Sequence, residues 1–340
     1  MTSNPRPEHP RVVFAMRGDL EPRLFDPALR ASLADAADVA PIVLSDAASP
    51  DAASYLAEAE VLLTCWGAPC LDAALLAAAP RLRAVVHAAG SVRGIVTDAC
   101  WERGIVVSSA TAANARPVAE YTLAMILLMG KQALEIRDRY RAERRSYFWQ
   151  LEYPDAGNYG RTVGIIGASR TGRELIRLLA PLDIRVLVYD PYITADDARD
   201  LGVTKVELDD LCAASDIVTV HAPELPSTRN LIDRERLALM RDGTTLINTA
   251  RGSLVDTPAL LAELTAGRIN AVLDVTEPDT LPADSPLYTL PNVVLTPHIA
   301  GSIGTELRRL GASAVAEIAR YVRGEPFAFP VLREETDHTA

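Results

Sequence analysis

The sequence predicts an α/β fold with two doubly wound parallel sheets. Short apolar runs alternate with helical segments through the first hundred residues, and a second series of the same kind begins at Thr162. This alternation is typical of parallel sheets whose strands are joined by helices. A length of 340 residues also favours two domains over one.

The first series predicts strands at residues 11–16, 42–44, 61–65, 84–87 and 106–108, with helices at 27–37, 54–59 and 71–79. A long apolar helix is expected over 114–129, opened by a polar cap at Asn114 and closed by Gly130. A charged helix is expected over 137–145. The aromatic residues that follow, Tyr147, Phe148, Trp149 and Tyr153, predict either an interface or local packing.

The second series predicts strands at 163–166, 185–189, 217–220, 245–247, 271–273 and 293–295. A last helix is expected over 304–323, because Gly324 and Pro326 follow it. Most of the chemically suggestive residues lie just after strands of this second series.

Composition narrows the class of protein. The net charge of -11 and the pI near 5.0 disfavour a nucleic-acid partner, which requires a basic face. The four cysteines are scattered without metal-site spacing, so no metal site is predicted and a reducing compartment is favoured. The first ten residues hold three prolines and no apolar run, which indicates a loose tail and not a signal peptide. The apolar stretch 123–129 is too short to span a membrane, so no membrane partner and a cytoplasmic location are expected.

A glycine turn follows the predicted strand 163–166. It runs Gly167-Ala168-Ser169-Arg170-Thr171-Gly172 and precedes a helix, the context expected of a dinucleotide site. Gly167 permits the tight turn, Gly172 lets the helix pack closely, and the amides at the helix start bind the pyrophosphate. Ser169 stands where the usual pattern has a middle glycine. Its Cβ is expected to crowd the pyrophosphate, whereas its hydroxyl can bond a phosphate oxygen.

Asp190 ends the next strand, 18 residues after Gly172 (190 − 172 = 18). This is close to the roughly 20-residue spacing of the acidic residue that binds the adenosine ribose. A carboxylate accepts hydrogen bonds from the ribose hydroxyls and repels a 2′-phosphate. The sequence therefore predicts NAD as the cofactor in preference to NADP.

His298 follows the predicted strand 293–295, and Arg251 follows the strand 245–247. Histidine exchanges a proton near neutral pH, and arginine grips a carboxylate through two hydrogen bonds. Asp274, Glu277 and Asp279 supply carboxylates nearby in the sequence, one of which can orient the histidine. These residue types are the parts needed to reduce a keto acid.

From about Leu82 to Gly324 the chain resembles the D-isomer-specific 2-hydroxyacid dehydrogenase family. The motifs that carry the resemblance are the glycine turn, His221-Ala222-Pro223 with Thr228, Asn248-Thr249-Ala250-Arg251-Gly252, Leu273-Asp274-Val275 and Thr296-Pro297-His298. The resemblance implies a flavodoxin-like substrate domain from residues 1–110 plus 302–340 and a Rossmann NAD-binding domain from 111–301. It also implies an active site in the cleft between them and a homodimer.

The resemblance assigns roles by position. Arg251 matches the residue that binds the substrate carboxylate and carbonyl, and His298 matches the proton donor and acceptor. Asp274 matches the residue that hydrogen-bonds the nicotinamide amide, while His221 lines the cofactor. His87 is expected to be a satisfied buried histidine. The cofactor site is expected to comprise Gly167, Ser169, Arg170, Thr171, Gly172, Asp190, His221, Ala222, Pro223, Thr228, Thr249, Ala250, Asp274 and Gly301.

The chain departs from the family at the carboxylate that assists the histidine. The family has a glutamate five residues after the motif aspartate, and Asp279 stands at that position here (274 + 5 = 279). Its reach is shorter by about 1.5 Å, the length of one C–C bond. Three alternatives remain open: Asp279 assists His298 after a small shift of its loop, Glu277 substitutes for it, or His298 acts unassisted. Asp279 is the preferred catalytic partner.

A second departure lies in the loop Ala88-Ala89-Gly90-Ser91-Val92-Arg93-Gly94, where the family carries a glycine-rich turn followed by Asp-Asn. The amides of Gly90, Ser91 and Val92 are expected to hold the substrate carboxylate. Arg93 replaces the aspartate. With Arg116 it either recognises a second anionic group on the substrate or is simply exposed to solvent.

The expected function is NAD-dependent interconversion of a small 2-keto acid and its D-2-hydroxy acid. One alternative is a phosphite- or formate-type dehydrogenase of the same fold, of which the formate branch is disfavoured by Asp279. Another is a non-catalytic NAD-sensing scaffold similar to the family's corepressors. Retention of Arg251 and His298 favours catalysis.

Overall fold

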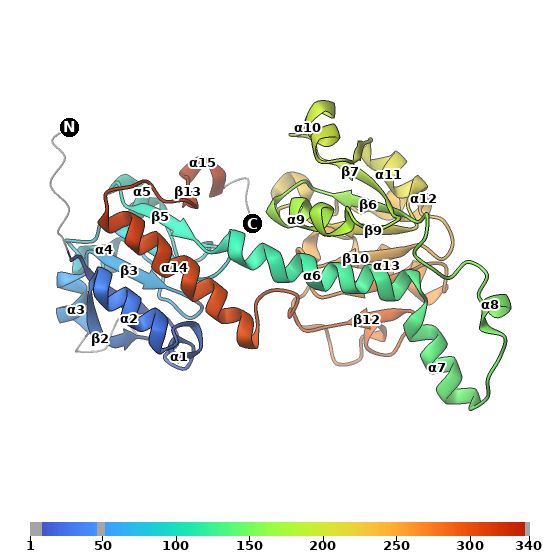
Figure 1. Cartoon of the computed structure of the whole chain (residues 1–340), viewed down its shortest axis with the longest axis horizontal. Coiled ribbons are helices and arrows are strands. Elements are labelled where there is room, and N and C mark those ends of the chain that lie inside the picture. The colour runs from blue at the N-terminus through green and yellow to red at the C-terminus, as the bar shows by residue number, and fades with distance from the viewer. Residues whose placement is uncertain (1–8, 46–51, 337–340) are drawn as a thin grey trace. The chain divides into compact units, whose positions relative to one another are not determined.

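The computed structural model describes residues 9–45 and 52–336. Residues 1–8, which hold most of the predicted tail, lie outside the described part, as do 46–51 and 337–340. The chain forms two compact units, one from the described residues of Met1–Asn114 and Ser302–Ala340, the other from Ala115–Gly301. Each contains one sheet covered by helices, so the predicted α/β fold with two doubly wound sheets is confirmed (Figure 1).

The first unit contains a six-stranded sheet in the order β13-β5-β4-β3-β1-β2. Its strands run parallel except β13, which pairs antiparallel with β5. The strands are β1 (Arg11–Ala15), β2 (Asp38–Leu44), β3 (Val61–Thr64), β4 (Ala84–His87), β5 (Val106–Ser109) and β13 (Pro330–Val331). The sequence did not predict β13 and placed the start of β2 too late.

The helices of the first unit follow its strands. They are α1 (Glu21–Leu24), α2 (Pro27–Ala36), α3 (Ala52–Glu58), α4 (Ala73–Ala78), α5 (Asp98–Glu102), the start of α6 (Thr111–Gly130), α14 (Leu307–Val322) and α15 (Arg333–Thr336). A single-turn helix, η4 (Gly304–Glu306), precedes α14. The late helix α14 packs beside α1 and α2 from the beginning of the chain (Figure 1).

The start of α6 corrects one prediction. The helix begins at Thr111, so Asn114 lies inside its first turn and is not the N-cap. The side-chain oxygen of Asn114 instead accepts a hydrogen bond from the amide of Ser302 at 2.9 Å. A polar side chain in the first turn of a helix is easily mistaken for an N-cap from sequence. Here the hydrogen-bond partner of Asn114 is a residue far along the chain.

The second unit contains a seven-stranded, wholly parallel sheet in the order β12-β11-β10-β9-β6-β7-β8. Its strands are β6 (Thr162–Ile166), β7 (Arg185–Tyr189), β8 (Thr204–Lys205), β9 (Ile217–Val220), β10 (Thr245–Asn248), β11 (Asn270–Leu273) and β12 (Val293–Leu295). Only the two-residue strand β8 was not predicted. Strands β6, β9 and β10 are buried along their full length, as expected of a parallel sheet with both faces covered.

The helices of the second unit connect these strands. They are α7 (Ala133–Glu143), α8 (Trp149–Glu152), α9 (Arg170–Leu179), α10 (Ala195–Asp200), α11 (Leu208–Ala214), α12 (Arg234–Leu239) and α13 (Thr257–Thr265). Three single turns, η1 (Pro226–Thr228), η2 (Gly252–Leu254) and η3 (Pro286–Tyr288), join them. Several starts follow from local chemistry: Ser169, Asp233 and Asp256 each accept a backbone amide of the first turn as N-caps.

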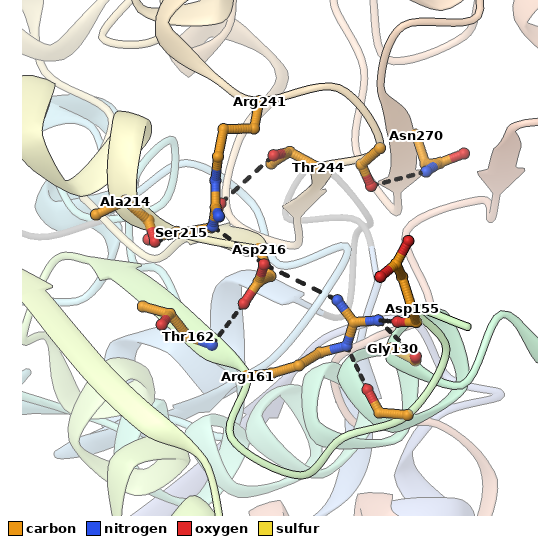
Figure 2. Close-up of polar contacts among 12 residues, drawn as sticks. Gly130, Asp155, Arg161, Thr162, Ala214, Ser215, Asp216, Arg241, Thr244 and Asn270 are labelled. Atoms are coloured by element: carbon orange, nitrogen blue, oxygen red, sulfur yellow. Dashed lines mark hydrogen bonds and ion pairs between the residues drawn. The ribbon is translucent and has the colours of Figure 1, made fainter. Parts of the chain in front are cut away.

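The amino-terminal edge of the second sheet is held by a polar network around Asp216 (Figure 2). Its carboxylate accepts the amide of Thr162 at 2.8 Å, at the start of β6, and the guanidinium of Arg241 at 3.0 Å. Arg161 contacts the same carboxylate at 4.0 Å and also binds the carbonyl of Gly130 at the end of α6. These contacts connect the segment before β6 to the end of α6. They all lie at the amino-terminal edge of the sheet, so none involves the loops at its carboxyl-terminal edge.

Among residues 9–45 and 52–336, no helix combines the length and the apolar character that crossing a membrane requires. Within the same residues, no group of three or more histidine, cysteine, aspartate and glutamate side chains is placed to hold a metal ion.

Candidate functional site

The residues singled out in the second unit converge on the carboxyl-terminal edge of its sheet. Because all seven strands are parallel, the loops after β6, β7, β9, β10, β11 and β12 leave from the same edge. Parallel α/β sheets bind ligands at this edge. The glycine turn, Asp190, Arg251 and His298 all lie in these loops.

The glycine turn after β6 has the geometry that its sequence predicts. Gly167 has φ of 98°, and a Cβ there would lie 2.8 Å from the amide nitrogen of Ala222. A Cβ on Gly172 would lie 2.1 Å from the carbonyl oxygen of Gly167. Both positions therefore require glycine, the first for its left-handed backbone and both for the close approach of neighbouring chain.

The start of α9 offers unpaired donors to an anion. Within the described part of the chain, the amides of Ser169, Arg170 and Thr171 donate to no protein acceptor. The Ser169 hydroxyl caps the helix by accepting the amide of Gly172 at 3.3 Å. Its proton is still available to a phosphate oxygen, so the serine adds a donor while its Cβ occupies space. Free amides at the positive end of a ten-residue helix fit the pyrophosphate of a dinucleotide.

Asp190 follows β7 and stands beside the glycine turn. One oxygen accepts the amide of Ala168 at 2.7 Å, and the other accepts the amide of Tyr192 at 2.8 Å. A carboxylate has about four acceptor sites, so capacity remains for ribose hydroxyls. The hydrogen bond to Ala168 fixes the distance between the ribose-binding candidate and the pyrophosphate turn.

The segment after β9 packs its histidine inward. His221 is 5% exposed, and its Nε2 lies 2.9 Å from the hydroxyl of Thr219. Burial lowers the pKa of His221 to about 4, so it is neutral near pH 7. The Thr228 hydroxyl binds the carbonyl of Pro223 at 2.7 Å and accepts the amide of Leu225 at 2.8 Å, which closes the turn. Ala222, Pro223 and Thr228 thus shape this loop, whatever they contact on a ligand.

The turn that carries Arg251 is framed by Asn248. The Asn248 side chain donates to the carbonyl of Arg251 at 2.8 Å and accepts the amide of Ala250 at 3.1 Å. The Arg251 side chain is 33% exposed, and its Nε lies 3.9 Å from a carboxylate oxygen of Glu224. Glu224 also accepts the Ser253 hydroxyl at 2.5 Å. The guanidinium therefore remains accessible while a carboxylate stands at one side of it.

Asp274 is almost completely enclosed, at 1% exposed. One of its oxygens accepts the Thr296 hydroxyl at 2.6 Å and the amide of Ile299 at 2.8 Å. The other accepts the amide of Ala300 at 2.9 Å. One acceptor site on this second oxygen remains for a cofactor amide, so the predicted nicotinamide contact stays a prediction.

His298 is exposed and has a left-handed backbone, with φ of 56°. Its amide donates to the carbonyl of Asp274 at 2.8 Å. Within the described residues, the imidazole makes no hydrogen bond or ion pair. The ring is therefore open to a ligand, although its main chain is fixed.

The two carboxylates proposed to assist His298 differ in their partners. Glu277 is paired with Arg229 at 2.7 Å. Asp279 is exposed, and its carboxylate has no hydrogen-bond or ion-pair partner in the described part of the chain. Asp279 is thus uncommitted, whereas Glu277 would have to leave Arg229 in order to reach the histidine.

The loop after β4 in the first unit keeps the features expected of an anion site. The backbone amides of Gly90, Ser91 and Val92 donate to no acceptor among the described residues. The carbonyl of Gly90 accepts the Thr111 hydroxyl at 2.9 Å, which anchors the loop. His87, at the end of β4, is 1% exposed with its Nδ1 2.9 Å from the Thr64 hydroxyl, as expected of a satisfied buried histidine.

The two arginines considered for a second substrate anion have different surroundings. Arg116 binds Glu120, and it donates to Glu174 at 2.8 Å. A guanidinium shared by two carboxylates is a poor receptor for another anion, which argues against Arg116 in that role. The Arg93 residue is exposed.

Sequence reasoning missed several residues of this region. Tyr121 and Thr296 hydrogen-bond each other, Asn248 frames the arginine turn, and Glu224 stands beside Arg251. Asn248 and Thr296 belong to the motifs that carry the resemblance, so their motif positions were the available signal. Tyr121, inside an apolar helix, has no such signal.

Comparison with known proteins places these loops in a family. Residues 123–300 match the family model described as D-isomer specific 2-hydroxyacid dehydrogenase, NAD binding domain. D-3-phosphoglycerate dehydrogenase of Mycobacterium bovis is 37% identical over 284 residues, which cover 81% of this chain and 52% of that protein. The chain thus spans about half the length of that relative.

Two further proteins are similar over most of their length. (S)-sulfolactate dehydrogenase of Chromohalobacter salexigens is 37% identical over 257 residues, covering 74% of this chain and 81% of that protein. A D-lactate dehydrogenase structure from Aquifex aeolicus, complexed with NAD and lactic acid, is 27% identical with a TM-score of 0.70. That likeness covers 93% of this chain and 96% of the Aquifex chain.

The family match over residues 123–300 indicates a domain that binds NAD. The free amides of the glycine turn and the carboxylate of Asp190 are the groups expected to bind the pyrophosphate and the ribose of such a dinucleotide. NAD is therefore the cofactor that this unit is built for. The chain belongs to the D-isomer-specific 2-hydroxyacid dehydrogenase family, and residues 123–300 are its NAD-binding domain.

Proposed function

We propose that this protein is an NAD-dependent oxidoreductase that interconverts a small 2-keto acid and its D-2-hydroxy acid. The observation that carries the proposal is the accessible pair of Arg251 and His298, on the same sheet edge as the dinucleotide turn. Relatives named for the dehydrogenation of sulfolactate and the reduction of glyoxylate support the substrate class, a small anionic acid.

Each residue has a distinct role in the proposed reaction. NADH, when bound, supplies the hydride. Arg251 binds the substrate carboxylate and polarises the keto oxygen through charge-assisted hydrogen bonds. His298 donates a proton to that oxygen during reduction and removes it during oxidation. The exposed imidazole and the fixed backbone of His298 suit this exchange.

Asp279 is the proposed partner of His298. The support is its uncommitted carboxylate, since the Glu277 carboxylate is held by Arg229 at 2.7 Å. Asp279→Asn and Glu277→Gln, assayed across pH, separate the two. We expect Asp279→Asn to change the pH profile of kcat and Glu277→Gln to leave it unchanged. If neither substitution changes the profile or the rate, His298 acts without a carboxylate partner.

The amides of Gly90, Ser91 and Val92 are the proposed second grip on the substrate carboxylate. Their lack of protein acceptors supports this role. Three convergent amides bind an anion without a charged side chain. The participation of Arg93 in binding a distal anion stays a weaker prediction. Kinetics of Arg93→Ala with substrates that have or lack a distal anion test it, and equal effects on both contradict it.

Cofactor preference rests on Asp190. Its carboxylate disfavours a 2′-phosphate, so we expect NADH to be used in preference to NADPH at equal concentration. Clear preference for NADPH would refute this assignment.

A homodimer is the proposed assembly, and a cytoplasmic location remains a prediction from the sequence. The support is the exposed aromatic and apolar surface around α7 and α8, where Phe148 is 67% exposed and Leu151 is 73% exposed. No residue of α7 is buried within the described chain, so the helix has a face available to a partner. Sedimentation of Phe148→Ser/Leu151→Ser against the unmodified protein tests whether this surface holds the dimer.

The decisive experiment measures NADH oxidation with a panel of acids. The panel contains glyoxylate, hydroxypyruvate, pyruvate, branched and aromatic keto acids, oxaloacetate and phosphonopyruvate, with phosphite and formate tested in the direction of NAD reduction. We expect turnover of at least one 2-keto acid and loss of that turnover in His298→Asn. Bound NADH without turnover of any compound would favour the non-catalytic scaffold, and reduction of NAD by phosphite alone would favour the phosphite alternative.

A further inference from the structure

A partly buried hydrogen-bond chain, whose innermost member is Asp274, is connected to the loop that carries His298. The Tyr121 hydroxyl, on α6, lies 2.8 Å from the Thr296 hydroxyl. The Thr296 hydroxyl in turn lies 2.6 Å from a carboxylate oxygen of Asp274. The chain links a helix to the loops after β11 and β12, all within the second unit.

Asp274 organises the whole segment 296–300. Besides the Thr296 hydroxyl, its carboxylate accepts the amides of Ile299 at 2.8 Å and Ala300 at 2.9 Å. Its main-chain carbonyl accepts the amide of His298 at 2.8 Å. Asp274 thus accepts four hydrogen bonds, from His298 itself and from residues on both sides of it. They hold it in the left-handed conformation that non-glycine residues adopt rarely.

Proton positions in the chain follow from donor chemistry. An ionised carboxylate only accepts, so the Thr296 hydroxyl donates to Asp274 and its oxygen is left to accept from Tyr121. Burial raises the pKa of Tyr121, and the nearby negative charge of Asp274 raises it further, against the opposing effect of the Thr296 hydrogen bond. Tyr121 therefore keeps its proton and donates throughout the neutral range.

We propose that Tyr121 and Asp274 are positioning residues that set the direction of the His298 imidazole through Thr296. The proposal rests on the proposed function, in which His298 is the proton donor. Asp274 acts here on its own loop, a role distinct from the expected contact with the cofactor amide. Tyr121 acts through its hydrogen bond to Thr296.

A double-mutant cycle tests the chain. Tyr121→Phe removes only the hydroxyl, and Thr296→Val removes both hydrogen bonds of the Thr296 hydroxyl while nearly preserving its shape. Loss of one hydrogen bond corresponds to about a 3- to 10-fold change, so we expect kcat to fall by about that factor in Tyr121→Phe and by more in Thr296→Val. KM for the keto acid and Kd for NADH are expected to stay constant. The double variant should match Thr296→Val alone, because Tyr121 acts through Thr296.

Two readouts separate positioning from a structural role. The pH profile of kcat should change in both variants, and the His298 Hε1 resonance, assigned with His298→Asn, should move or broaden in the full-length protein without substrate. Tyr321→Phe is the control, because it removes a hydroxyl from a buried tyrosine of α14 in the other unit. We expect it to change neither readout.

The outcomes distinguish this proposal from the proposed function. If His298→Asn retains full turnover, the assigned role of His298 is wrong. If His298→Asn is inactive while Tyr121→Phe and Thr296→Val change neither kcat nor the resonance, the function stands and the positioning chain is overturned. Additive losses in the double variant would also overturn the chain, since they would show that Tyr121 acts independently of Thr296.

Discussion

The end of β4 in the first unit and the segment after β12 in the second both carry a histidine at the carboxyl-terminal edge of a parallel sheet. His87 is 1% exposed and bound to Thr64, and burial lowers its pKa to about 4. His298 is exposed, with its main chain in a left-handed turn and its imidazole unpaired in the described structure. The same residue type at the same kind of strand end has opposite surroundings.

The difference comes from where the chain turns after each strand. His87 is the last residue of β4, a strand that is buried along its full length, so its ring lies in the packed interior. His298 lies three residues beyond β12, where hydrogen bonds to Asp274 fold the loop around it. The backbone beyond β12 therefore leaves the His298 ring accessible, whereas the His87 ring stays in the packed interior of the first unit.

The largest effect on turnover is expected from a substitution of His298. His298→Asn removes the proton donor but keeps a residue that tolerates the left-handed turn. We expect kcat to fall by about 10²- to 10⁴-fold, the usual contribution of a general acid. Kd for NADH and the urea midpoint should stay unchanged, because the ring is exposed. A loss of kcat below about 10-fold would show that another group supplies the proton.

The buried histidines should appear in the pH dependence of stability. Burial lowers the pKa of His87 and His221 to about 4 in the folded protein, against the ordinary histidine value of about 6.5, so the unfolded chain binds more protons between these values. Stability is therefore fully present above pH 6.5 and falls as the pH is lowered towards 4. Between pH 7.5 and 5 we expect a loss of about 2 kcal/mol for each histidine.

Urea unfolding of the protein and of His87→Gln at pH 7.5 and 5.0 measures this loss. The variant has one titrating buried histidine fewer, so its stability should depend on pH about half as strongly through the histidines. An unchanged pH dependence in His87→Gln would show that His87 is not the source.

Arg251 is the second residue at the edge of the second sheet where a substitution should affect turnover. Its partly exposed guanidinium is proposed to form two parallel hydrogen bonds with the substrate carboxylate, which lysine cannot reproduce. Arg251→Lys should raise KM for the keto acid by about 10- to 100-fold, equivalent to the 1.5–3 kcal/mol of a charged hydrogen bond. Kd for NADH should not change. Initial-rate kinetics measure KM, and a binding titration measures Kd for NADH. If the keto acid and NADH bind more weakly by the same factor, Arg251 has a structural role and does not bind the substrate specifically.

The last effect, on stability and not on turnover, is expected at Thr64, the partner of His87. Thr64→Val keeps the shape of the side chain and removes the hydroxyl that faces Nδ1 at 2.9 Å. We expect the free energy of unfolding to fall by about 1 to 3 kcal/mol, because a buried ring nitrogen loses its partner. Urea unfolding at pH 7.5 measures it, and kcat is the control. A loss of kcat without a loss of stability would mean that the first edge also takes part in chemistry.

The sequence by itself determined the features that arise from local or periodic patterns. Alternating apolar runs gave nearly every strand of both sheets, since parallel strands are short and buried on both faces. The turn from Gly167 to Gly172 was recognisable because a side chain at either glycine would clash with neighbouring backbone. His298 and Arg251 were recognisable because each follows a buried strand within a short motif.

The tertiary structure alone decided which side chains those positions contact. Tyr121 and Thr296 are 175 residues apart, and their hydrogen bond leaves no periodic trace in the sequence. The partner of Asn114 is Ser302, the partner of Glu277 is Arg229, and the oxygens of Asp274 accept amides of a loop that is distant in sequence. Hydrogen bonds and ion pairs depend on ångström-scale placement after packing. The partners of the residues around His298 and Arg251 therefore could not be predicted from the sequence and were identified only in the folded structure.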